Sequence, residues 1–282
     1  MKTLGEVLTL TSQFLKEKNI GRPRRIAEEL LGHTLKLGRL DLYMRFDQPM
    51  MEQELETLRA LLKRAVKGEP IAYIIQEISF YYCAIRLTPD VLIPRPETEI
   101  LVDLACKQIQ QDSFSGKVAW DLCTGSGCIG VALKKACPDL TVVLSDISEA
   151  ALLVAAGNAE RNEVQVERVH GDLLAPFSSR KADIVFCNPP YVSPREYIEL
   201  DPSVRDYEPK LALVAEEEGL AFYRRLKEGL PSHLNPGAKI YLELGSGQGN
   251  ALLSLFSGPE WRVARIEKDW AGHDRFFFLE FE

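Results

Sequence analysis

Residues 121–130 read Asp-Leu-Cys-Thr-Gly-Ser-Gly-Cys-Ile-Gly and contain a glycine-rich loop of the form Gly125-x-Gly127-x-x-Gly130. The apolar run Val118–Leu122 leads into this loop and predicts a buried strand, and a helical pattern follows it. Glycines at such a turn let the backbone approach a ligand closely, while the first turn of the helix offers free N–H groups. The stretch therefore predicts a nucleotide-binding βα unit.

Short apolar runs alternate with helical patterns from Lys117 to the end of the chain. This alternation predicts βαβ units, and hence an α/β fold with a doubly wound, mostly parallel sheet covered by helices on both faces. A last strand is expected at or near the sheet edge. The predicted strands are Val118–Leu122, Thr141–Ser145, Ile184–Cys187, Lys239–Leu244, Arg262–Ile266 and Phe276–Phe281.

The first seventy or so residues have a different pattern. Apolar residues recur at three-to-four-residue spacing over Leu4–Leu15 and Leu55–Val66, and Ile26–Leu31 suggests a further helix between them. Two β-rich runs follow, at Ile78–Tyr82 and Ala84–Leu87. We expect a small N-terminal helical bundle at residues 1–72, a β-hairpin linker at 73–92 and the α/β domain at 93–282.

Composition narrows the possible functions of the 282-residue chain. A hydrophobic share of 46% supports a packed core, and a net charge of -7 argues against sequence-independent nucleic-acid binding, which relies on clustered Lys and Arg. The six cysteines form no Cys-x-x-Cys pair and the four histidines complete no zinc-ligand spacing, so we expect free thiols and no metal. Without a leader-like start or a bilayer-spanning apolar run, the protein is expected to be cytoplasmic.

Asp146 ends the next predicted strand at about the 20-residue spacing expected for a carboxylate that binds ribose hydroxyls. Taken singly, a glycine-rich turn and a strand-terminal aspartate would more often be ordinary loop residues. Together and in this order they favour a nucleoside cofactor. NAD and S-adenosylmethionine both present an adenosine to such a loop, so the loop alone leaves both open.

The tetrad Asn188-Pro-Pro-Tyr191 follows directly on the apolar run Ala182–Cys187. An amide or exocyclic amine nitrogen is a poor nucleophile because its lone pair is conjugated, and its two N–H groups need two acceptors. The Asn188 side chain and the Pro189 carbonyl can supply them, and Tyr191 can cover a planar group. No hydride acceptor needs such a pair, so the tetrad favours methyl transfer from S-adenosylmethionine.

The glycine-rich loop and the tetrad would lie at one site if the strands that precede them are neighbours in the sheet. In an open doubly wound sheet, ligands bind outside the carboxyl ends of the strands, where the strand order reverses. If the strand ending at Leu122 lies beside the strand ending at Cys187, the glycine-rich loop and the tetrad meet at that crevice.

Over nearly its whole length the chain resembles the PrmC/HemK family of release factor glutamine methyltransferases. This resemblance implies a class I methyltransferase fold with a seven-stranded sheet. It also implies methyl transfer from S-adenosylmethionine to the side-chain amide nitrogen of the glutamine in the Gly-Gly-Gln motif of class-1 release factors. The segments that carry it are Ile93-Pro-Arg-Pro-Glu-Thr-Glu99, the glycine-rich loop, Asn188-Pro-Pro-Tyr-Val192, Glu208-Pro209, Ala212-Leu213, Gly219-Leu220 and Glu243-x-Gly245.

The resemblance also implies the roles of particular residues. Asn188, Pro189, Pro190 and Tyr191 match the residues that hold the substrate glutamine, with Asn188, Pro189 and Tyr191 as the catalytic set. The amino-terminal bundle is expected to help dock the release factor. The residues expected at the cofactor are Cys123, Thr124, Gly125, Ser126, Gly127, the ribose carboxylate Asp146, Asp172 and Leu173 beside the adenine, and Asn188.

Two departures from the family pattern concern local geometry. Cys123 stands where the family usually has glycine, and its β-carbon penalises a left-handed conformation. Ala215-Glu216 replaces a usual Gly-Gly pair. Two further features have competing interpretations: Glu97 and Glu99 either line the cofactor pocket or begin a helix, and Gly245–Gly249 is more simply a strand-to-helix turn than a second nucleotide loop.

Three other functions stay open at this point. The enzyme could methylate a glutamine of a ribosomal protein, or the N6 nitrogen of adenine in DNA or RNA, although the acidic charge counts against a nucleic-acid substrate. A third possibility is an adaptor that kept the fold without the chemistry. The intact glycines and tetrad count against it.

Overall fold

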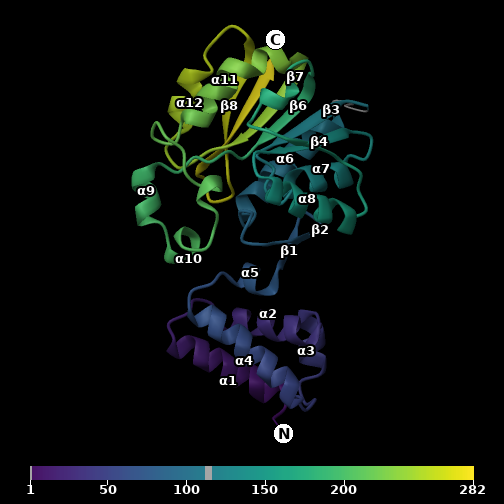
Figure 1. The fold of residues 1–282 in the computed structure, drawn as a ribbon, viewed down its shortest axis with the longest axis vertical. Helices are drawn as coiled ribbons and strands as arrows, with labels where there is room; N and C mark the ends of the chain where they lie inside the picture. The colour runs from purple at the N-terminus through teal and green to yellow at the C-terminus, as the bar shows by residue number, and fades with distance from the viewer. Residues whose placement is uncertain (1, 112–115) are drawn as a thin grey trace. The chain divides into compact units, whose positions relative to one another are not determined.

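The computed structural model describes residues 2–111 and 116–282, which form two compact units. One unit extends to Gln76 and includes Pro202–Tyr207, and the other comprises Glu77–Asp201 and Glu208–Glu282. The β-hairpin that was expected to be a linker thus belongs to the second unit. The segment boundaries at residues 72 and 92 remain predictions. Both units are drawn in Figure 1.

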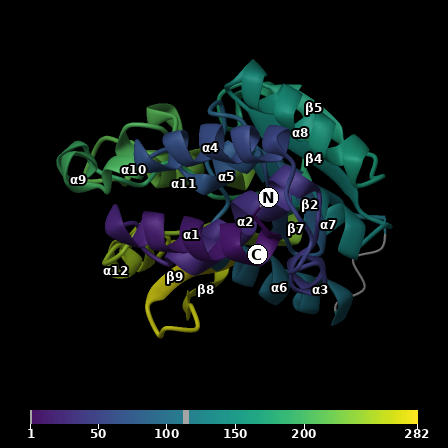
Figure 2. The ribbon, with the colours of Figure 1, turned by 90° about the horizontal axis from the view of Figure 1, so that it is seen from below.

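Helices make up the first unit. α1, α2 and α4 carry the periodic apolar residues expected from the sequence, and α1 and α4 each pack against α2 (Figure 2). The short helices α3 and α5 have too few turns for a recognisable period. The Tyr207 hydroxyl donates to the Lys67 carbonyl at 3.0 Å, which ties α10 to this unit. The helices are α1 Leu4–Glu17, α2 Pro23–Leu35, α3 Arg39–Met44, α4 Glu52–Val66, α5 Ile71–Ile75 and α10 Pro202–Arg205.

A seven-stranded sheet in the order β5-β4-β3-β6-β7-β9-β8 forms the centre of the second unit. Strands β5, β4, β3, β6 and β7 are parallel, whereas β9 runs antiparallel to both β7 and β8. The predicted α/β fold class is therefore confirmed, and the last strand lies one position from the edge. The strands are β3 Val118–Leu122, β4 Thr141–Asp146, β5 Glu167–His170, β6 Ala182–Cys187, β7 Leu234–Glu243, β8 Trp261–Lys268 and β9 Asp274–Phe281.

Helices cover both faces of this sheet. α6, α7 and α8 contact one another in sequence on one face, and α11 and α12 contact each other on the other face, as both views show (Figures 1 and 2). The core between them includes Trp120 of β3, which stacks on Phe177 with ring centroids 4.0 Å apart. The remaining elements are α6 Pro96–Gln111, α7 Cys128–Ala136, α8 Glu149–Arg161, η1 Ala175–Phe177, α9 Pro194–Glu199, η2 Lys210–Ala212, α11 Ala221–His233 and α12 Gly249–Leu255.

Side-chain amides attach the hairpin β1 Glu77–Phe80 and β2 Cys83–Arg86 to α8. Asn158 Oδ1 accepts from the Arg86 N–H at 2.7 Å, and its Nδ2 donates back to the Arg86 carbonyl at 3.0 Å. Asn162 makes the same pair of bonds with Ala84 at 3.0 and 2.9 Å. Both asparagines are buried, Asn158 within α8 and Asn162 directly after its last residue, so the backbone groups of the hairpin edge find their partners in the α/β unit itself.

The register between β3 and β6 determines where a ligand can bind. Leu122 is paired with Cys187, so the strand before the glycine-rich loop lies beside the strand before the tetrad, as expected. From this pair the sheet continues through β4 on one side and β7 on the other, which makes it the point where the strand order reverses. Both loops therefore leave the sheet at the same edge.

Candidate active site

A cavity of about 390 Å³ opens at this edge, within the size range of small-molecule sites. Most residues predicted to bind the cofactor line it: Cys123, Thr124, Gly125, Ser126, Asp146, Asp172, Leu173 and Asn188. Of the other predicted site residues, Pro190 also lines the cavity, whereas Gly127, Pro189 and Tyr191 do not. The structure thus brings the glycine-rich loop, the ends of β4 and β5 and the start of the tetrad to one site.

Asp121, at the end of β3, organises the glycine-rich loop from beneath. Its Oδ2 accepts from the Thr124 hydroxyl at 2.5 Å and from the Gly130 N–H at 2.9 Å. The carboxyl is only 1% exposed, and burial raises the pKa of Asp121 to about 7 because the charged form loses its hydration. No role for Asp121 was predicted from the sequence, although an aspartate within an apolar strand that leads into a loop is a signal for one.

The loop backbone needs left-handed conformations. Gly125 and Gly127 have φ values of 53° and 78°. A β-carbon on Gly127 would lie 2.9 Å from the Ala155 Cβ, so Gly127 allows α7 and α8 to pack closely rather than facing the cavity. Cys123 also has a positive φ, 55°, so the conformation that favours glycine persists despite its side chain. This conformation costs an L-residue about 1–2 kcal/mol.

Asp146 is held rigidly at the end of β4. Its Oδ2 accepts from the Gly125 N–H and its Oδ1 from the Ser148 N–H, both at 2.9 Å. Burial is the largest influence on its carboxyl and raises the pKa of Asp146. Each oxygen keeps a further lone pair, so the carboxylate can accept hydrogen bonds from a ligand while it fixes the loop.

Asp172 and Leu173 follow β5 on the cavity wall. Asp172 pairs with Arg225 of α11 at 2.7 Å, and Arg225 also lines the cavity. Leu173 has a φ of 49°, a left-handed conformation within this short turn. An ion pair between half-exposed side chains contributes little stability, so its main effect is to hold these two polar groups at the rim.

Asn188 presents a free carboxamide to the cavity. The residue is partly exposed, lines the cavity, and makes no side-chain hydrogen bond to any residue in 2–111 or 116–282. Pro189 and Pro190 beside it are buried. An amide with both its carbonyl and its NH2 group unengaged is available to a ligand.

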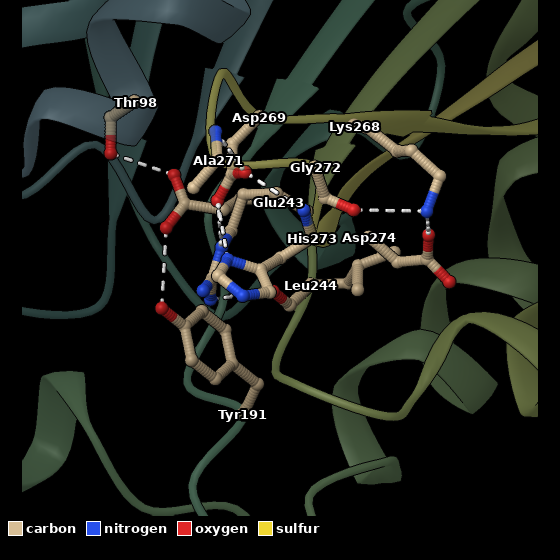
Figure 3. Close-up of polar contacts among 11 residues, drawn as sticks. Thr98, Tyr191, Glu243, Leu244, Lys268, Asp269, Ala271, Gly272, His273 and Asp274 are labelled. Atoms are coloured by element: carbon tan, nitrogen blue, oxygen red, sulfur yellow. Dashed lines mark hydrogen bonds and ion pairs between the residues drawn. The ribbon is translucent and has the colours of Figure 1, made fainter.

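Tyr191 lies behind the cavity rather than in its wall. Its hydroxyl donates to Glu243 Oε1 at 3.2 Å, and the Thr98 hydroxyl of α6 donates to Glu243 Oε2 at 2.7 Å (Figure 3). The Tyr191 ring packs against the core around β6 and β7. Its predicted contact with the substrate stays a prediction, since the structure places its hydroxyl in a buried network.

Glu243 is the centre of that network. The side chain is fully buried, and burial raises its pKa above the ordinary range while the two hydroxyl donors act in the opposite direction. The Tyr223 hydroxyl donates to the Glu243 carbonyl at 2.7 Å. Glu243 belongs to the segment Glu243-x-Gly245, which resembles the family, but nothing in the sequence indicated that Tyr191 is its partner.

The segment at residues 93–99 contacts Glu208-Pro209, another segment that carries the family resemblance. Glu208 accepts from the Ile93 N–H at 3.0 Å and pairs with Arg95 at 2.6 Å, and its side chain is almost fully buried. Glu97 and Glu99 lie in the first turn of α6, outside the cavity wall, and Glu99 accepts from the Tyr81 N–H at 2.7 Å. The helix-start interpretation of these two glutamates therefore fits the structure.

Within the described residues, no group of His, Cys, Asp or Glu side chains could hold a metal ion. Over the same ranges, no helix has the length and apolar character needed to cross a bilayer. All six cysteines are free thiols.

Two family models match separate parts of the chain: the PrmC N-terminal domain at residues 6–75 and the methyltransferase small domain at residues 98–200. The release factor glutamine methyltransferase of Chlamydia trachomatis serovar D is 40% identical, over 98% of this chain and 94% of its own. The chain belongs to the release factor glutamine methyltransferase family. The Geobacter sulfurreducens release factor glutamine methyltransferase is 38% identical, over 97% of this chain and 95% of its own.

Solved structures show that this family member shares its fold with other methyltransferases. A Pyrococcus furiosus methyltransferase matches with a TM-score of 0.54 and 19% identity, over 77% of this chain and 96% of its own. The Thermus thermophilus 16S rRNA N2 G1207 methyltransferase, in complex with AdoMet and guanosine, matches with a TM-score of 0.53 and 16% identity, over 73% of this chain and 50% of its own. At these identities the likeness concerns the fold alone.

Proposed function

We propose that the protein transfers a methyl group from S-adenosylmethionine to the side-chain amide nitrogen of the glutamine in the Gly-Gly-Gln motif of class-1 peptide-chain release factors. One observation supports this most directly: the unengaged Asn188 carboxamide lies in the same cavity wall as the glycine-rich loop and Asp146. Family membership agrees with it, since the curated relatives are named release factor glutamine methyltransferases.

S-adenosylmethionine fits the chemistry of the cavity. Asp146 offers carboxylate lone pairs to ribose hydroxyls, and Leu173 and Phe222 offer apolar surface to an adenine. The buried Ser126 hydroxyl has no partner among the described residues, which is the state expected of a group that serves a ligand. When bound, S-adenosylmethionine supplies an electrophilic methyl group on a positively charged sulfur.

The tetrad's contribution is to hold and orient the acceptor. The Asn188 Oδ1 and the Pro189 carbonyl oxygen accept the two N–H groups of the glutamine amide, which fixes the direction of the nitrogen lone pair. Holding two reactants in an attack geometry can contribute about 7 to 11 kcal/mol. Because the nitrogen becomes acidic only as its bond to carbon forms, its proton leaves late, to solvent, and no strong base is needed.

The remaining assignments complete the proposal. The segments are a docking bundle at residues 1–72, a hairpin linker at 73–92 and the methyltransferase domain at 93–282, with the bundle contacting the release factor in the cytoplasm. Thr124, Gly125, Ser126 and Asp172 are assigned to the cofactor with Cys123, and Gly127 acts through helix packing. Pro190 restricts the tetrad backbone between Pro189 and Tyr191.

One labelling experiment tests this function against the alternatives. The protein is incubated with methyl-labelled S-adenosylmethionine and, separately, a class-1 release factor, ribosomal proteins and DNA or RNA, and the label is located by mass spectrometry. The proposal predicts one methyl group on the glutamine of the Gly-Gly-Gln motif. Label in ribosomal protein or nucleic acid alone would overturn it, and the absence of label in every acceptor would favour the adaptor.

A further inference from the structure

The turn at Gly245–Gly249, which the sequence suggested was a simple strand-to-helix connection, carries a side chain with three hydrogen bonds. Gln248 occupies the position directly before α12, and its side chain makes no capping bond to that helix. Its Oε1 accepts from the Gly245 N–H at 2.9 Å, while its Nε2 donates to the Tyr191 carbonyl at 3.1 Å and to the Glu218 carbonyl at 3.4 Å. One carboxamide therefore joins the β7–α12 turn to the tetrad and to the loop before α11.

Two glycines leave the room that this arrangement needs. A β-carbon on Gly219, whose φ is 82°, would lie 2.1 Å from the Tyr191 carbonyl oxygen and 2.5 Å from Gln248 Nε2. A β-carbon on Gly245 would lie 2.9 Å from Gln248 Oε1 and 3.1 Å from the Tyr191 ring. Both positions lie in segments that resemble the methyltransferase family, and the close contacts explain physically why glycine stands there.

The contacts fix the tetrad on its carboxyl side. Tyr191 is held at two points, its hydroxyl by Glu243 and its carbonyl by Gln248. Directly after it, the Val192 N–H donates to the Leu213 carbonyl and the Val192 carbonyl accepts from the Ala215 N–H, both at 2.9 Å. Although Ala215-Glu216 departs from the family pattern, the Ala215 backbone still pairs with the residue that follows the tetrad.

On its amino side the tetrad is fixed by the sheet. Cys187 is paired with Leu122 of β3 and with Leu242 of β7. Between these two fixed ends remain Asn188 and two prolines, whose rings restrict their own φ and the conformation of the residue before them. The separation and direction of the two acceptor oxygens therefore depend on where the Tyr191 carbonyl is held.

We propose that Gln248 is a positioning residue for methyl transfer, acting through the Tyr191 carbonyl on the acceptor oxygens of Asn188 and Pro189. This inference rests on the proposed function of the tetrad. Gln248 does not line the cavity, so it acts on the geometry of the acceptor site and not on the cofactor. A displacement of about 1 Å in such a geometry can lower a rate by about 10²-fold.

Two variants and a matched control test this role. Gln248→Glu keeps the acceptor for the Gly245 N–H but replaces the NH2 group, which donates both other bonds, with an oxygen that faces two carbonyl oxygens. Gln248→Leu removes all three side-chain bonds. Ser246→Ala changes an exposed residue of the same turn. We measure kcat and KM for the acceptor protein, the S-adenosylmethionine dissociation constant by calorimetry, and hydrogen exchange at the Val192 amide by mass spectrometry.

Both Gln248 variants are expected to lose about 10²-fold in kcat while KM and cofactor affinity stay within about twofold, and Ser246→Ala to match the wild type. Val192 exchange should accelerate in both. Unchanged kcat, or a parallel loss of cofactor affinity, would contradict the positioning role. If the wild type methylates no release factor, the proposed function fails separately, and unchanged Val192 exchange would still overturn the role of Gln248.

Discussion

Replacing Tyr191 by phenylalanine removes one hydroxyl and leaves the aromatic ring in its place. The hydroxyl donates to Glu243 Oε1 at 3.2 Å, and no other side chain in the described ranges 2–111 and 116–282 donates to that oxygen. Since Glu243 is fully buried, water cannot substitute freely for the lost donor. The carboxyl, whose pKa burial already raises, then loses one of the two hydroxyl donors that stabilise its charged form.

A buried acceptor without its partner costs about 1–3 kcal/mol. For a domain of the size of the α/β unit, each kcal/mol corresponds to a shift of about 2–4 °C in Tm, so Tyr191→Phe is expected to lower Tm by about 2–12 °C. Turnover should fall less than in the Gln248 variants, because the backbone bond at the Tyr191 carbonyl remains.

Calorimetric unfolding and steady-state kinetics check this expectation together. Tyr82→Phe is the matched control, because Tyr82 belongs to the same unit and is 90% exposed. The double variant Tyr191→Phe with Glu243→Gln should destabilise less than the sum of the two single changes, since both remove one interaction. A Tyr191→Phe protein as stable as the Tyr82→Phe control would refute the assignment of the tyrosine hydroxyl to this buried network.

Two further predictions concern the glycine-rich loop. Asp146→Asn should weaken S-adenosylmethionine binding in calorimetry, because it removes the charge that accepts hydrogen bonds at the cavity wall, and unchanged affinity would exclude Asp146 from the cofactor site. Asp121 keeps its proton in the folded state up to a pKa of about 7, whereas the unfolded state loses it near 3.8. Its contribution to the free energy of unfolding should therefore fall as pH rises from about 4 to about 7, by up to about 1.4 kcal/mol per pH unit. Denaturant titrations of Asp121→Asn should show a flatter profile across that window, and identical slopes for the two proteins would contradict the raised pKa.

Periodicity was enough to predict the longest helices of the N-terminal unit and the central strands of the sheet. The strands β3, β4 and β6 are continuous apolar runs because parallel central strands are buried on both faces, and α1 and α4 carry a single apolar stripe. Strand β5 was not predicted, because Glu167-Arg-Val-His170 lies at the sheet edge and contains no apolar run. The local sequence pattern therefore predicts buried strands, but it does not predict a polar edge strand that forms by pairing with its neighbour in the sheet.

The residues that line the candidate site were largely predictable from the sequence. The residues that hold them in place through hydrogen bonds were not. The glycine-rich loop, Asp146 and Asn188 each stand directly after a predicted strand, so sequence position alone places them at the carboxyl edge. The partners of Tyr191 come from distant parts of the chain, Glu243 and Gln248. Contacts between residues more than fifty positions apart leave no local pattern, which is why neither partner of Tyr191 was predicted from the sequence.

The central claim is that the Asn188 carboxamide orients an acceptor nitrogen beside the cofactor. Its most direct test is the single-turnover rate of methyl transfer to a release factor by Asn188→Ala, measured with cofactor affinity on the same preparation. The predicted result is a loss of at least about 10²-fold in rate with nearly unchanged S-adenosylmethionine binding, because only the acceptor geometry is disturbed. A variant that transfers methyl groups at the wild-type rate would contradict the claim.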